Sequence, residues 1–369
     1  MERLTLTGIA GAIIKNITAI AGINDPQLKI TPVGFLKMLV ENNALVQVTN
    51  EEDLQKGQAR DIKVRYMQRG LESEVSDRDD CDTPITPEWK ESTIGAPLYS
   101  KIGIMITDEQ MRKYQAVATE PTSLGNVKIS RALYETILTH VGALLNNIDK
   151  KLVAAQASKW GKNAAYDTDA AQSIELGTKA DMGDGVVRLL LDAEANEVEG
   201  DLLVCGNGRV RAFDLYNKLK SGADSNGFGS LTLNAYSDPK TATLWGKDHF
   251  GVFAKGCVGF VDINKNVGEY AGEKGSSIFF QIPMPVMING TVLPINFDCQ
   301  LKYEDCPQYD AQGNKIADRG YKLIIGKTYG LFNLPNDCFK EGDPLAGVNG
   351  SFHYVATEQD ETYNVRNVE

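Results

Sequence analysis

Residues 201–214 (DLLVCGNGRVRAFD) have the order strand, glycine turn and helix that nucleotide-binding sites use. The residues from Leu202 to Val204 are apolar in succession, as in a buried strand, and helical spacing begins at Val210. A dinucleotide fingerprint also needs a third glycine, and Arg211 stands in its place. No second parallel strand with an acidic ribose ligand follows at the expected distance. We therefore interpret the segment as a tight turn between a strand and a helix.

Two other stretches resemble chemical motifs but miss their requirements. In GYKLIIGKT (320–328) five residues separate the glycines, where a phosphate loop has four, and the intervening residues favour a strand. SDPK (237–240) matches the SxxK pattern of serine acyl enzymes, but Pro239 opposes the helix on which that pattern depends. Both are interpreted as chance matches.

The histidines and cysteines form no recognisable catalytic or metal-binding set. The three histidines, His140, His249 and His353, lie far apart in the sequence and in different expected elements. The six cysteines show no CxxC spacing, so we expect free thiols in a reducing cytoplasm. Acidic pairs such as Asp79 and Asp80 belong to a solvated charge run. The sequence therefore predicts no catalytic residues, no cofactor-binding residues, no cofactor and no metal ligands.

Composition places the chain among ordinary globular proteins. It has 369 residues, of which 42% are hydrophobic and 24% charged. No stretch reaches the roughly eighteen consecutive apolar residues of a membrane span, and the N-terminus is typical of an amphipathic arm rather than a signal peptide. The formal net charge of −11 argues against general attraction to nucleic acid, which requires a basic surface.

Periodicity predicts the elements that would position any site. A short helix is expected over 32–42, and two half-buried strands over 62–69 and 97–107. Residues 70–96 between them contain eight acidic and two basic residues, so they predict a long exposed tip. Thr107 and Gln110 have the spacing of a capping box that opens a short helix.

The strongest signal is a helix over 127–158, in which apolar residues recur every three or four positions. At 1.5 Å per residue it would be roughly 48 Å long, a length that suits a plate-like subunit. Another helix is expected over 180–197 and mostly strands from 229 onward. The last of these form a hairpin with its turn at 310–314, and the tail beyond 340 is weakly patterned.

The two strands that flank the acidic tip raise the question of what covers them. A two-stranded ribbon is only marginally stable by itself in water, so its apolar side needs a surface from elsewhere. A neighbouring copy is the simplest source. The predicted inter-subunit contact residues are Ile62, Val64, Tyr66, Leu98, Ile102, Ile104 and Ile106.

This order of elements resembles the major capsid protein of tailed bacteriophages, the Hong Kong 97-like fold, over roughly residues 30 to 340. In the resemblance, IKVRYMQR and PLYSKIGIMIT would be the arms of the extended loop and residues 127–159 the spine helix. The implied fold class is α+β. The implied parts are an N-terminal arm (1–57), an extended β-hairpin loop (58–106), a peripheral domain (107–182 and 291–340), an axial domain (183–290) and a C-terminal tail (341–369).

The resemblance implies a structural protein and not an enzyme. It would assemble into pentamers and hexamers of an icosahedral shell, in the bacterial cytoplasm, and end in the virion. Portal and scaffolding proteins would be its partners, and packaged DNA would be enclosed but not bound sequence-specifically. No membrane is involved.

Three alternatives stay open. The nearest is an encapsulin-type nanocompartment shell protein with the same fold. An α/β nucleotide-dependent enzyme built on residues 201–214 belongs to another class. A tail or other minor virion protein is the third, although the long helix fits it poorly.

Overall fold

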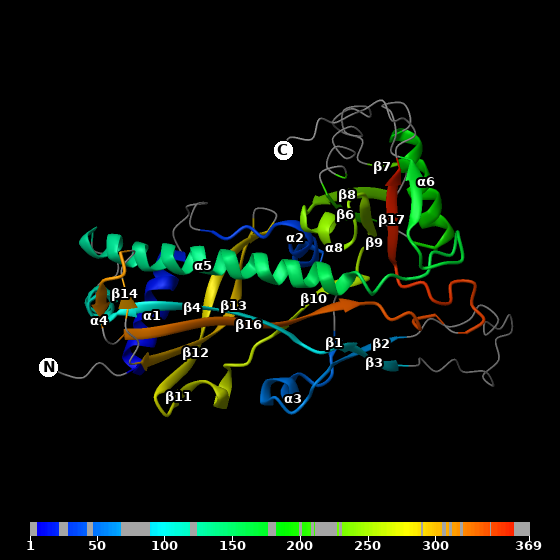
Figure 1. The fold of residues 1–369 in the computed structure, drawn as a ribbon. Helices are drawn as coiled ribbons and strands as arrows, with labels where there is room; N and C mark the ends of the chain where they lie inside the picture. The colour runs from blue at the N-terminus through cyan, green and yellow to red at the C-terminus, as the bar shows by residue number, and fades with distance from the viewer. Residues whose placement is uncertain are drawn as a thin grey trace.

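The protein is elongated, with one long helix lying along a large sheet and a second, smaller sheet unit at one end (Figure 1). The computed structural model describes the chain except residues 1–5, 22–28, 43–46, 68–88, 119–123, 176–181, 199–200, 208–209, 211–226, 229–230, 289–290, 305–307, 310–311, 318–319, 340 and 358–369. Its elements are helical and extended in comparable measure, so the fold class is α+β, as the sequence predicts.

The helices are α1 (Leu6–Ala21), α2 (Gly34–Glu41), α3 (Glu51–Lys56), α4 (Asp108–Ala118), α5 (Leu124–Gln156), α6 (Met182–Ala195) and α8 (Lys240–Leu244), with a short 3₁₀ turn, η3 (Gly268–Tyr270). The strands are β1 (Gln47–Val48), β2 (Ile62–Met67), β3 (Trp89–Gly95), β4 (Leu98–Thr107), β5 (Gln172–Glu175), β6 (Leu202–Gly206), β7 (Gly227–Phe228), β8 (Leu231–Ser237), β9 (His249–Ala254), β10 (Val258–Ile263), β11 (Gly272–Lys274), β12 (Ser277–Ile288), β13 (Thr291–Glu304), β14 (Gln308–Tyr309), β15 (Lys315–Ala317), β16 (Gly320–Asn333) and β17 (Ser351–Thr357).

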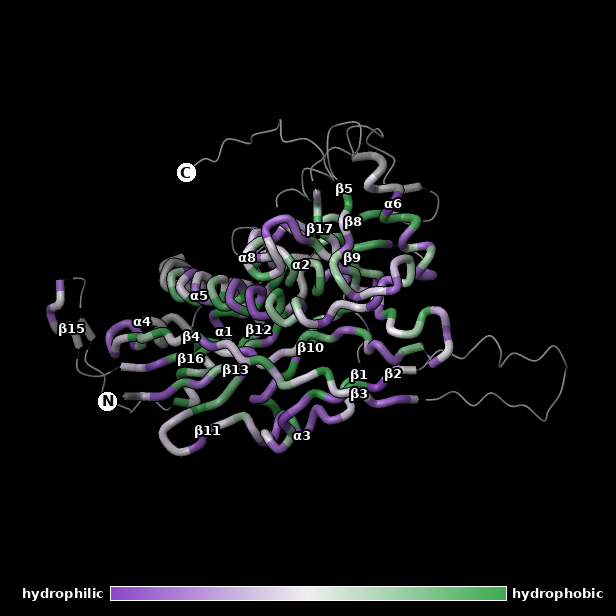
Figure 2. The backbone as a smooth tube through the Cα atoms, turned by 45° about the vertical axis from the view of Figure 1, so that its right-hand side comes forward, coloured by the Kyte–Doolittle hydropathy of each residue, from purple (hydrophilic) through white to green (hydrophobic). Residues whose placement is uncertain are grey.

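The large sheet is antiparallel and centres on β16. Strand β4 pairs with one edge of β16, and β13 and β10 pair in succession with the other. Strand β12 follows β13 and β11 follows β12. Hydrophobic and hydrophilic residues alternate along β13 from Ile295 to Lys302 (Figure 2), because side chains of a strand point to opposite faces in turn.

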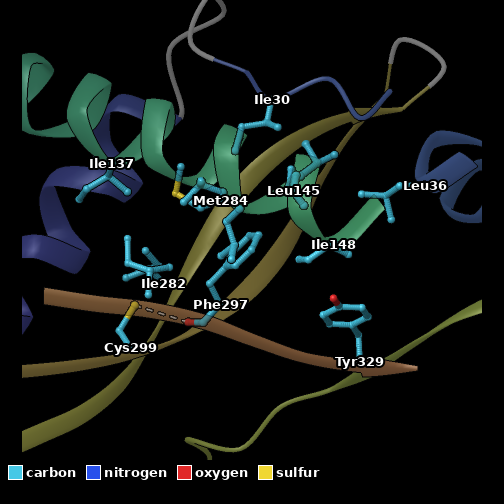
Figure 3. Close-up of a cluster of buried hydrophobic side chains, with 14 of the residues drawn as sticks. Ile30, Leu36, Ile137, Leu145, Ile148, Ile282, Met284, Phe297, Cys299 and Tyr329 are labelled. Atoms are coloured by element: carbon cyan, nitrogen blue, oxygen red, sulfur yellow. Dashed lines mark hydrogen bonds between the residues drawn. The ribbon is translucent and has the colours of Figure 1, made fainter. Parts of the chain in front are cut away.

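Helix α5 covers the inner face of this sheet. Its 33 residues span about 50 Å at 1.5 Å per residue. Its buried positions recur every three or four residues, namely Leu133, Ile137, Val141, Leu144, Ile148 and Leu152. They meet Ile282, Phe297 and Tyr329 of the sheet (Figure 3). Burying a side chain of this kind contributes about 1.5–3 kcal/mol, so this contact is a large contribution to the stability of the fold.

The second sheet has the order β5-β17-β9-β6-β8-β7 and mixes parallel and antiparallel pairs. It has a hydrophobic cluster of its own, with Leu189 of α6 packed against Val204, Phe250, Phe352 and Tyr354. This unit stands at the right-hand end of α5 in Figure 1.

Three expectations about the strands need correction. Strand β4 lies in the large sheet with β16 as its partner, whereas the ribbon is formed by β2 and β3. Strands β10, β11 and β12 belong to the large sheet and not to the second unit. Strand β17 lies inside the second sheet between β5 and β9, although residues beyond 340 read as a weakly patterned tail. The alternation of Phe352, Tyr354 and Ala356, all buried, was the signal for β17.

Candidate functional site

The candidate site is the ribbon formed by β2 and β3, which β1 widens at its base into a three-stranded antiparallel sheet, together with the part of the large sheet that holds that base. The two strands pair antiparallel from Ile62 opposite Gly95 to Met67 opposite Trp89. In Figure 1 they run away from the long helix at the lower right. The residues between Met67 and Trp89, which include most of the predicted acidic tip, lie outside the described residues.

A separate hydrophobic cluster fixes the base of the ribbon. Ile62 and Val64 of β2 pack with Leu54 of α3 and with Val261 and Ile263 of β10. Alternation explains this contact, because Ile62, Val64 and Tyr66 share one face of β2 while Lys63 and Arg65 share the other. The base of the ribbon is therefore buried by the chain itself.

Gly330 of β16 lets the ribbon approach closely. A Cβ atom at this position would lie 2.4 Å from Cδ1 of Ile62, well inside van der Waals contact. We expect Gly330→Ala to lower the free energy of unfolding by about 1–3 kcal/mol, because Cδ1 of the buried Ile62 would have to move to make room for the added methyl group. Gly103→Ala in β4 is the matched control, since its Cβ would meet only Cε of Lys322 at 3.6 Å. Urea unfolding of both variants measures the difference, and equal losses would contradict this role for Gly330.

Two polar anchors also hold the ribbon. The Tyr66 hydroxyl donates to Oδ1 of Asp337 at 2.6 Å, and burial together with this carboxylate raises the pKa of Tyr66. The Lys159 ammonium donates to the carbonyl oxygens of Ile94 at 2.8 Å and Leu331 at 3.2 Å. Desolvation lowers the pKa of Lys159. The segment that follows α5 is thereby tied to both β3 and β16.

Removal of the Tyr66 hydroxyl is expected to loosen this anchor. Tyr66→Phe should cost about 1 kcal/mol, because Asp337 loses a short hydrogen bond in a partly buried place. Tyr303→Phe provides a control, since its hydroxyl also donates to a carboxylate, Asp108 at 3.1 Å, but in an exposed position. We expect that control to lose less than about 0.5 kcal/mol in free energy of unfolding. Denaturant unfolding followed by tryptophan fluorescence reports both values, and a larger loss for Tyr303→Phe would refute the assignment.

The outward face of the ribbon is charged and aromatic. Lys63 and Glu91 form an ion pair of 2.9 Å, and Thr49 donates to Glu91 at 2.9 Å. The hydrogen bond between Lys63 and Glu91 raises the pKa of Lys63 and lowers the pKa of Glu91. The Arg65 guanidinium lies 4.7 Å from the ring centre of Trp89, whose surface is 52% exposed. This face can bind a partner through stacking and charge.

The seven predicted contact residues fall in two places. Ile62, Val64 and Tyr66 lie on the ribbon, whereas Leu98, Ile102, Ile104 and Ile106 lie on β4. Five are buried within the chain, four of them in its hydrophobic clusters and Tyr66 beside Asp337, and Leu98 and Ile102 are partly buried. The expectation that these side chains have no cover within one chain is therefore corrected, because β10, β16 and α5 supply it. The exposed Trp89, which sequence reasoning missed, lies on the alternating stretch 89–95.

A buried ionic cluster joins the two units of the fold. Lys240 of α8 forms an ion pair with Asp149 of α5 and lies 3.7 Å from Asp238, which follows β8. These carboxylates also accept the backbone N–H groups of Leu36 and Phe35 at the start of α2, at 2.7 and 3.1 Å. Burial, followed by the charge of Asp238, raises the pKa of Asp149 to about 6. The match of Lys240 to SxxK is thus explained by a structural role.

The other chemical motifs also have structural roles. Residues 320–328 lie within β16, as expected. In residues 201–214, β6 ends at Gly206, where a Cβ would lie 2.5 Å from Val210, and residues 208–209 and 211–214 are outside the described part. Cys205, Cys257, Cys299 and Cys338 are buried free thiols.

The fold brings two of the three histidines together, which the sequence did not predict. Nδ1 of His249 lies 2.9 Å from Nε2 of His353, on the paired strands β9 and β17. The His353 ring also stacks on Trp160 at 4.4 Å. Burial, followed by the charge of His249, lowers the pKa of His353 to about 4. His140 lies apart on α5, where its ring contacts the carbonyl of Thr136 at 2.7 Å.

Within the described ranges, no three histidine, cysteine or acidic side chains gather as a metal site would require. Of the helices that the structure describes, none combines the length and the apolarity needed to cross a bilayer. Two shallow cavities, of about 380 and 240 Å³, flank Tyr99 on β4.

Comparison with known proteins gives structural likenesses only. No family model and no curated protein matches the sequence. A chain from Mycobacterium phage Adephagia is similar with a TM-score of 0.42 and 12% identity, covering 92% of this chain and 94% of that one. The capsid structure of the Cyanophage P-SCSP1u gives 0.37 and 12%, with 81% and 84% covered. A virus-like particle from Pyrococcus furiosus gives 0.34 and 8%, with 95% and 98% covered. Each of these TM-scores is below 0.5, so the likenesses by themselves assign no function to this chain.

Proposed function

We propose that this protein is the major capsid protein of a tailed bacteriophage, with a Hong Kong 97-like fold, and that copies of it assemble into the icosahedral shell around the genome. In this proposal it is a structural protein and not an enzyme, and it resides in the virion after assembly in the bacterial cytoplasm. Portal and scaffolding proteins would be its partners. DNA would be enclosed without sequence-specific binding.

The observation that carries the proposal is an elongated body with a ribbon that the chain holds along one face and leaves exposed on the other. The ribbon is buried at Ile62 and Val64 but presents Trp89, 52% exposed, at the far end of β3. Strand β1 pairs with β2 at Val64 and Arg65, and beyond this pairing the ribbon is two-stranded, an arrangement that is marginal in water. An exposed aromatic side chain with a stacked arginine is typical of an interface anchor. A neighbouring copy would provide the missing contact.

The parts of the fold suggest how the subunit is divided. The unit built on the large sheet, with α5 as its spine, would be the peripheral domain, and the unit built on the second sheet would be the axial domain. The ribbon and the residues between its strands would be the extended loop, and residues 1–57 the N-terminal arm. The polar linkage through Asp149, Asp238 and Lys240 supports a fixed angle between the two units, as a curved shell requires.

The test is whether the purified protein forms closed shells. We expect sedimentation and negative-stain microscopy to show pentamers, hexamers and closed particles of uniform size. Trp89→Ser should reduce assembly at least tenfold in rate while leaving the thermal midpoint within about 2 °C, because the side chain is exposed. Leu191→Ser is the matched control, since Leu191 on α6 is 59% exposed but lies on the other unit. A stable monomer at high concentration would refute the proposal.

A further inference from the structure

Lys327 is a lysine that the fold buries within the core of the large sheet. The exposed fraction of its side chain is 1%. It lies two residues before Tyr329 on β16, so both side chains point to the face that α5 covers. Its Nζ atom is 5.7 Å from the ring centre of Phe297, which Figure 3 shows on the α5 side of β16. A lysine is buried to this extent only where specific partners hold its charge.

Three acceptors meet the Lys327 ammonium. Its Nζ atom forms an ion pair with Oδ1 of Asp262 on β10 and donates to the backbone carbonyl of Asn296 on β13. It also donates to the side-chain oxygen Oδ1 of Asn264 at 3.1 Å. The nitrogen is therefore held in one place, with a carboxylate and a carboxamide both in contact with it.

The strand register brings these side chains together. Antiparallel pairing places Asp262 of β10 opposite Tyr329, on the same face of the sheet as Lys327. Strand β10 ends one residue later, and Asn264 follows it, level with Lys327 of β16. The strands therefore need no rearrangement for the side chains of Lys327 and Asn264 to meet.

The three side chains are the set that an amine–amide exchange requires. Lys327 supplies an amine nucleophile, Asn264 a carbonyl carbon with an amide nitrogen that can leave, and Asp262 a carboxylate beside the nucleophile. The carbon Cγ of Asn264 is one C=O bond beyond Oδ1, so it lies within about 4.3 Å of Nζ. A small rotation of the Asn264 side chain brings this carbon to the roughly 3–3.5 Å from which attack occurs.

The surroundings favour movement of a proton from the lysine to the carboxylate. The transfer converts an ion pair into a neutral amine and a carboxylic acid, and two neutral groups cost less to hold away from water than two charges. Partial burial raises the pKa of Asp262, although the charge of Lys327 opposes this effect. The Asp262 side chain is 36% exposed, so ammonia released beside it has a way out to solvent.

We propose that Lys327 and Asn264 of the same chain form an isopeptide bond, with Asp262 as the group that moves the protons. The ammonium gives one proton to Asp262, and the free amine attacks Cγ of Asn264. The Nζ–Cγ bond forms and the Cγ–Nδ2 bond breaks. Asp262 gives its proton to the departing nitrogen and takes the second proton from Nζ. That proton leaves with the ammonia, so the products are one amide and one ammonium ion.

The bond would close the large sheet covalently. It would join the end of β10 to β16 and enclose β11, β12 and β13 in a ring formed by residues 264–327. A closed ring restricts the unfolded chain, and β10 could then not separate from β16 at this end. The reaction takes place within one chain, so this inference does not depend on the assembly proposed above.

Peptide mapping of the purified full chain tests the proposal. The chain is denatured, reduced and alkylated, so that no disulfide between Cys257 and Cys338 can join peptides, and is then digested with trypsin. We expect peptide 256–265 to be joined to peptide 323–340 and the branched product to be one ammonia lighter than the two peptides together. Trypsin should not cut after the linked Lys327. A succinimide at an asparagine loses the same mass but leaves the two peptides separate.

Two variants and a matched control assign the roles. Lys327→Arg keeps a cation but cannot form the bond, so peptide 256–265 should appear unbranched. Asp262→Asn should lower the linked fraction on the order of tenfold at a fixed time after expression. Asp201→Asn is the control, because Asp201 also pairs with a lysine, Lys255, and is 34% exposed, and it should leave the linked fraction unchanged. Thermal midpoints verify that each variant folds.

Separate, unmodified peptides 256–265 and 323–327 from the folded wild-type chain would overturn the proposal, whether or not any variant folds. A branched peptide that persists in Lys327→Arg would overturn the assignment of the nucleophile. A linked fraction in Asp262→Asn equal to that of wild type would overturn the role of Asp262. Sedimentation decides the proposed function separately, because the peptide map is the same for a monomer and for a shell.

Discussion

Replacing Lys240 by methionine is expected to lower the free energy of unfolding by about 3–5 kcal/mol. The exposed fractions of the Asp149 and Asp238 side chains are 1% and 0%, and Lys240 is the cation that lies between them. Without it, two carboxylates remain buried close together, stabilised by the backbone N–H groups at the start of α2 and by the backbone N–H of residue 240. Removal of one member of a buried charge cluster costs more than the intact cluster contributes.

The control for this prediction is Lys255→Met. Lys255 also pairs with an aspartate, Asp201 at 3.3 Å, but its side chain is 58% exposed. Such a pair contributes about 0–1 kcal/mol. The double variant Lys240→Met with Asp149→Asn should recover part of the loss, because one buried charge is then gone. Equal losses for Lys240→Met and Lys255→Met in urea unfolding would show that the buried cluster is not important for stability.

The second large effect is a pair of opposite pH dependences. His353 has a pKa lowered from 6.5 to about 4, so the folded chain binds fewer protons than the unfolded chain between these values. Its contribution to stability is present at higher pH and is lost as pH falls through this window. Asp149 has a pKa raised from 3.8 to about 6, so the folded chain binds more protons. Its contribution is present at low pH and is lost as pH rises through about 6.

Single variants should separate these two contributions. Relative to wild type, His353→Gln should become less stable as pH rises from 4 to 6.5, and Asp149→Asn should become more stable. The difference changes by at most about 1.4 kcal/mol per pH unit for one proton. Urea unfolding at several pH values measures both slopes, and each variant is the control for the other because the signs differ. Slopes of the same sign would contradict the assignment.

The two groups lie near the junction between the units, and in the wild-type chain their opposite pH dependences of stability partly cancel. Asp149 and Lys240 tie α5 to the second unit, and His353 lies on β17 beside Trp160, which follows α5. Both groups titrate over nearly the same pH range with opposite consequences for stability. A shell protein that has to hold one angle between its units would benefit from this compensation.

The sequence by itself determined the elements whose signals are local. Helix α5, with its buried residue every three or four positions, and the alternating β13 follow from periodicity within one segment, so their existence and buried faces could be predicted. The two-residue period also identified Ile62, Val64 and Tyr66 as one face of a strand, and the capping box at Thr107 and Gln110 forms at 3.1 and 3.2 Å.

Only the tertiary structure decided which surface covers each of those faces. Strand β4 pairs with β16, more than two hundred residues later in the chain, and not with its neighbour β2. Lys240 meets Asp149 across 91 positions and His249 meets His353 across 104. A period tells which side of an element is apolar but contains no information on its partner. That choice depends on the total burial that the whole chain can achieve, and so it is settled only when all elements pack together.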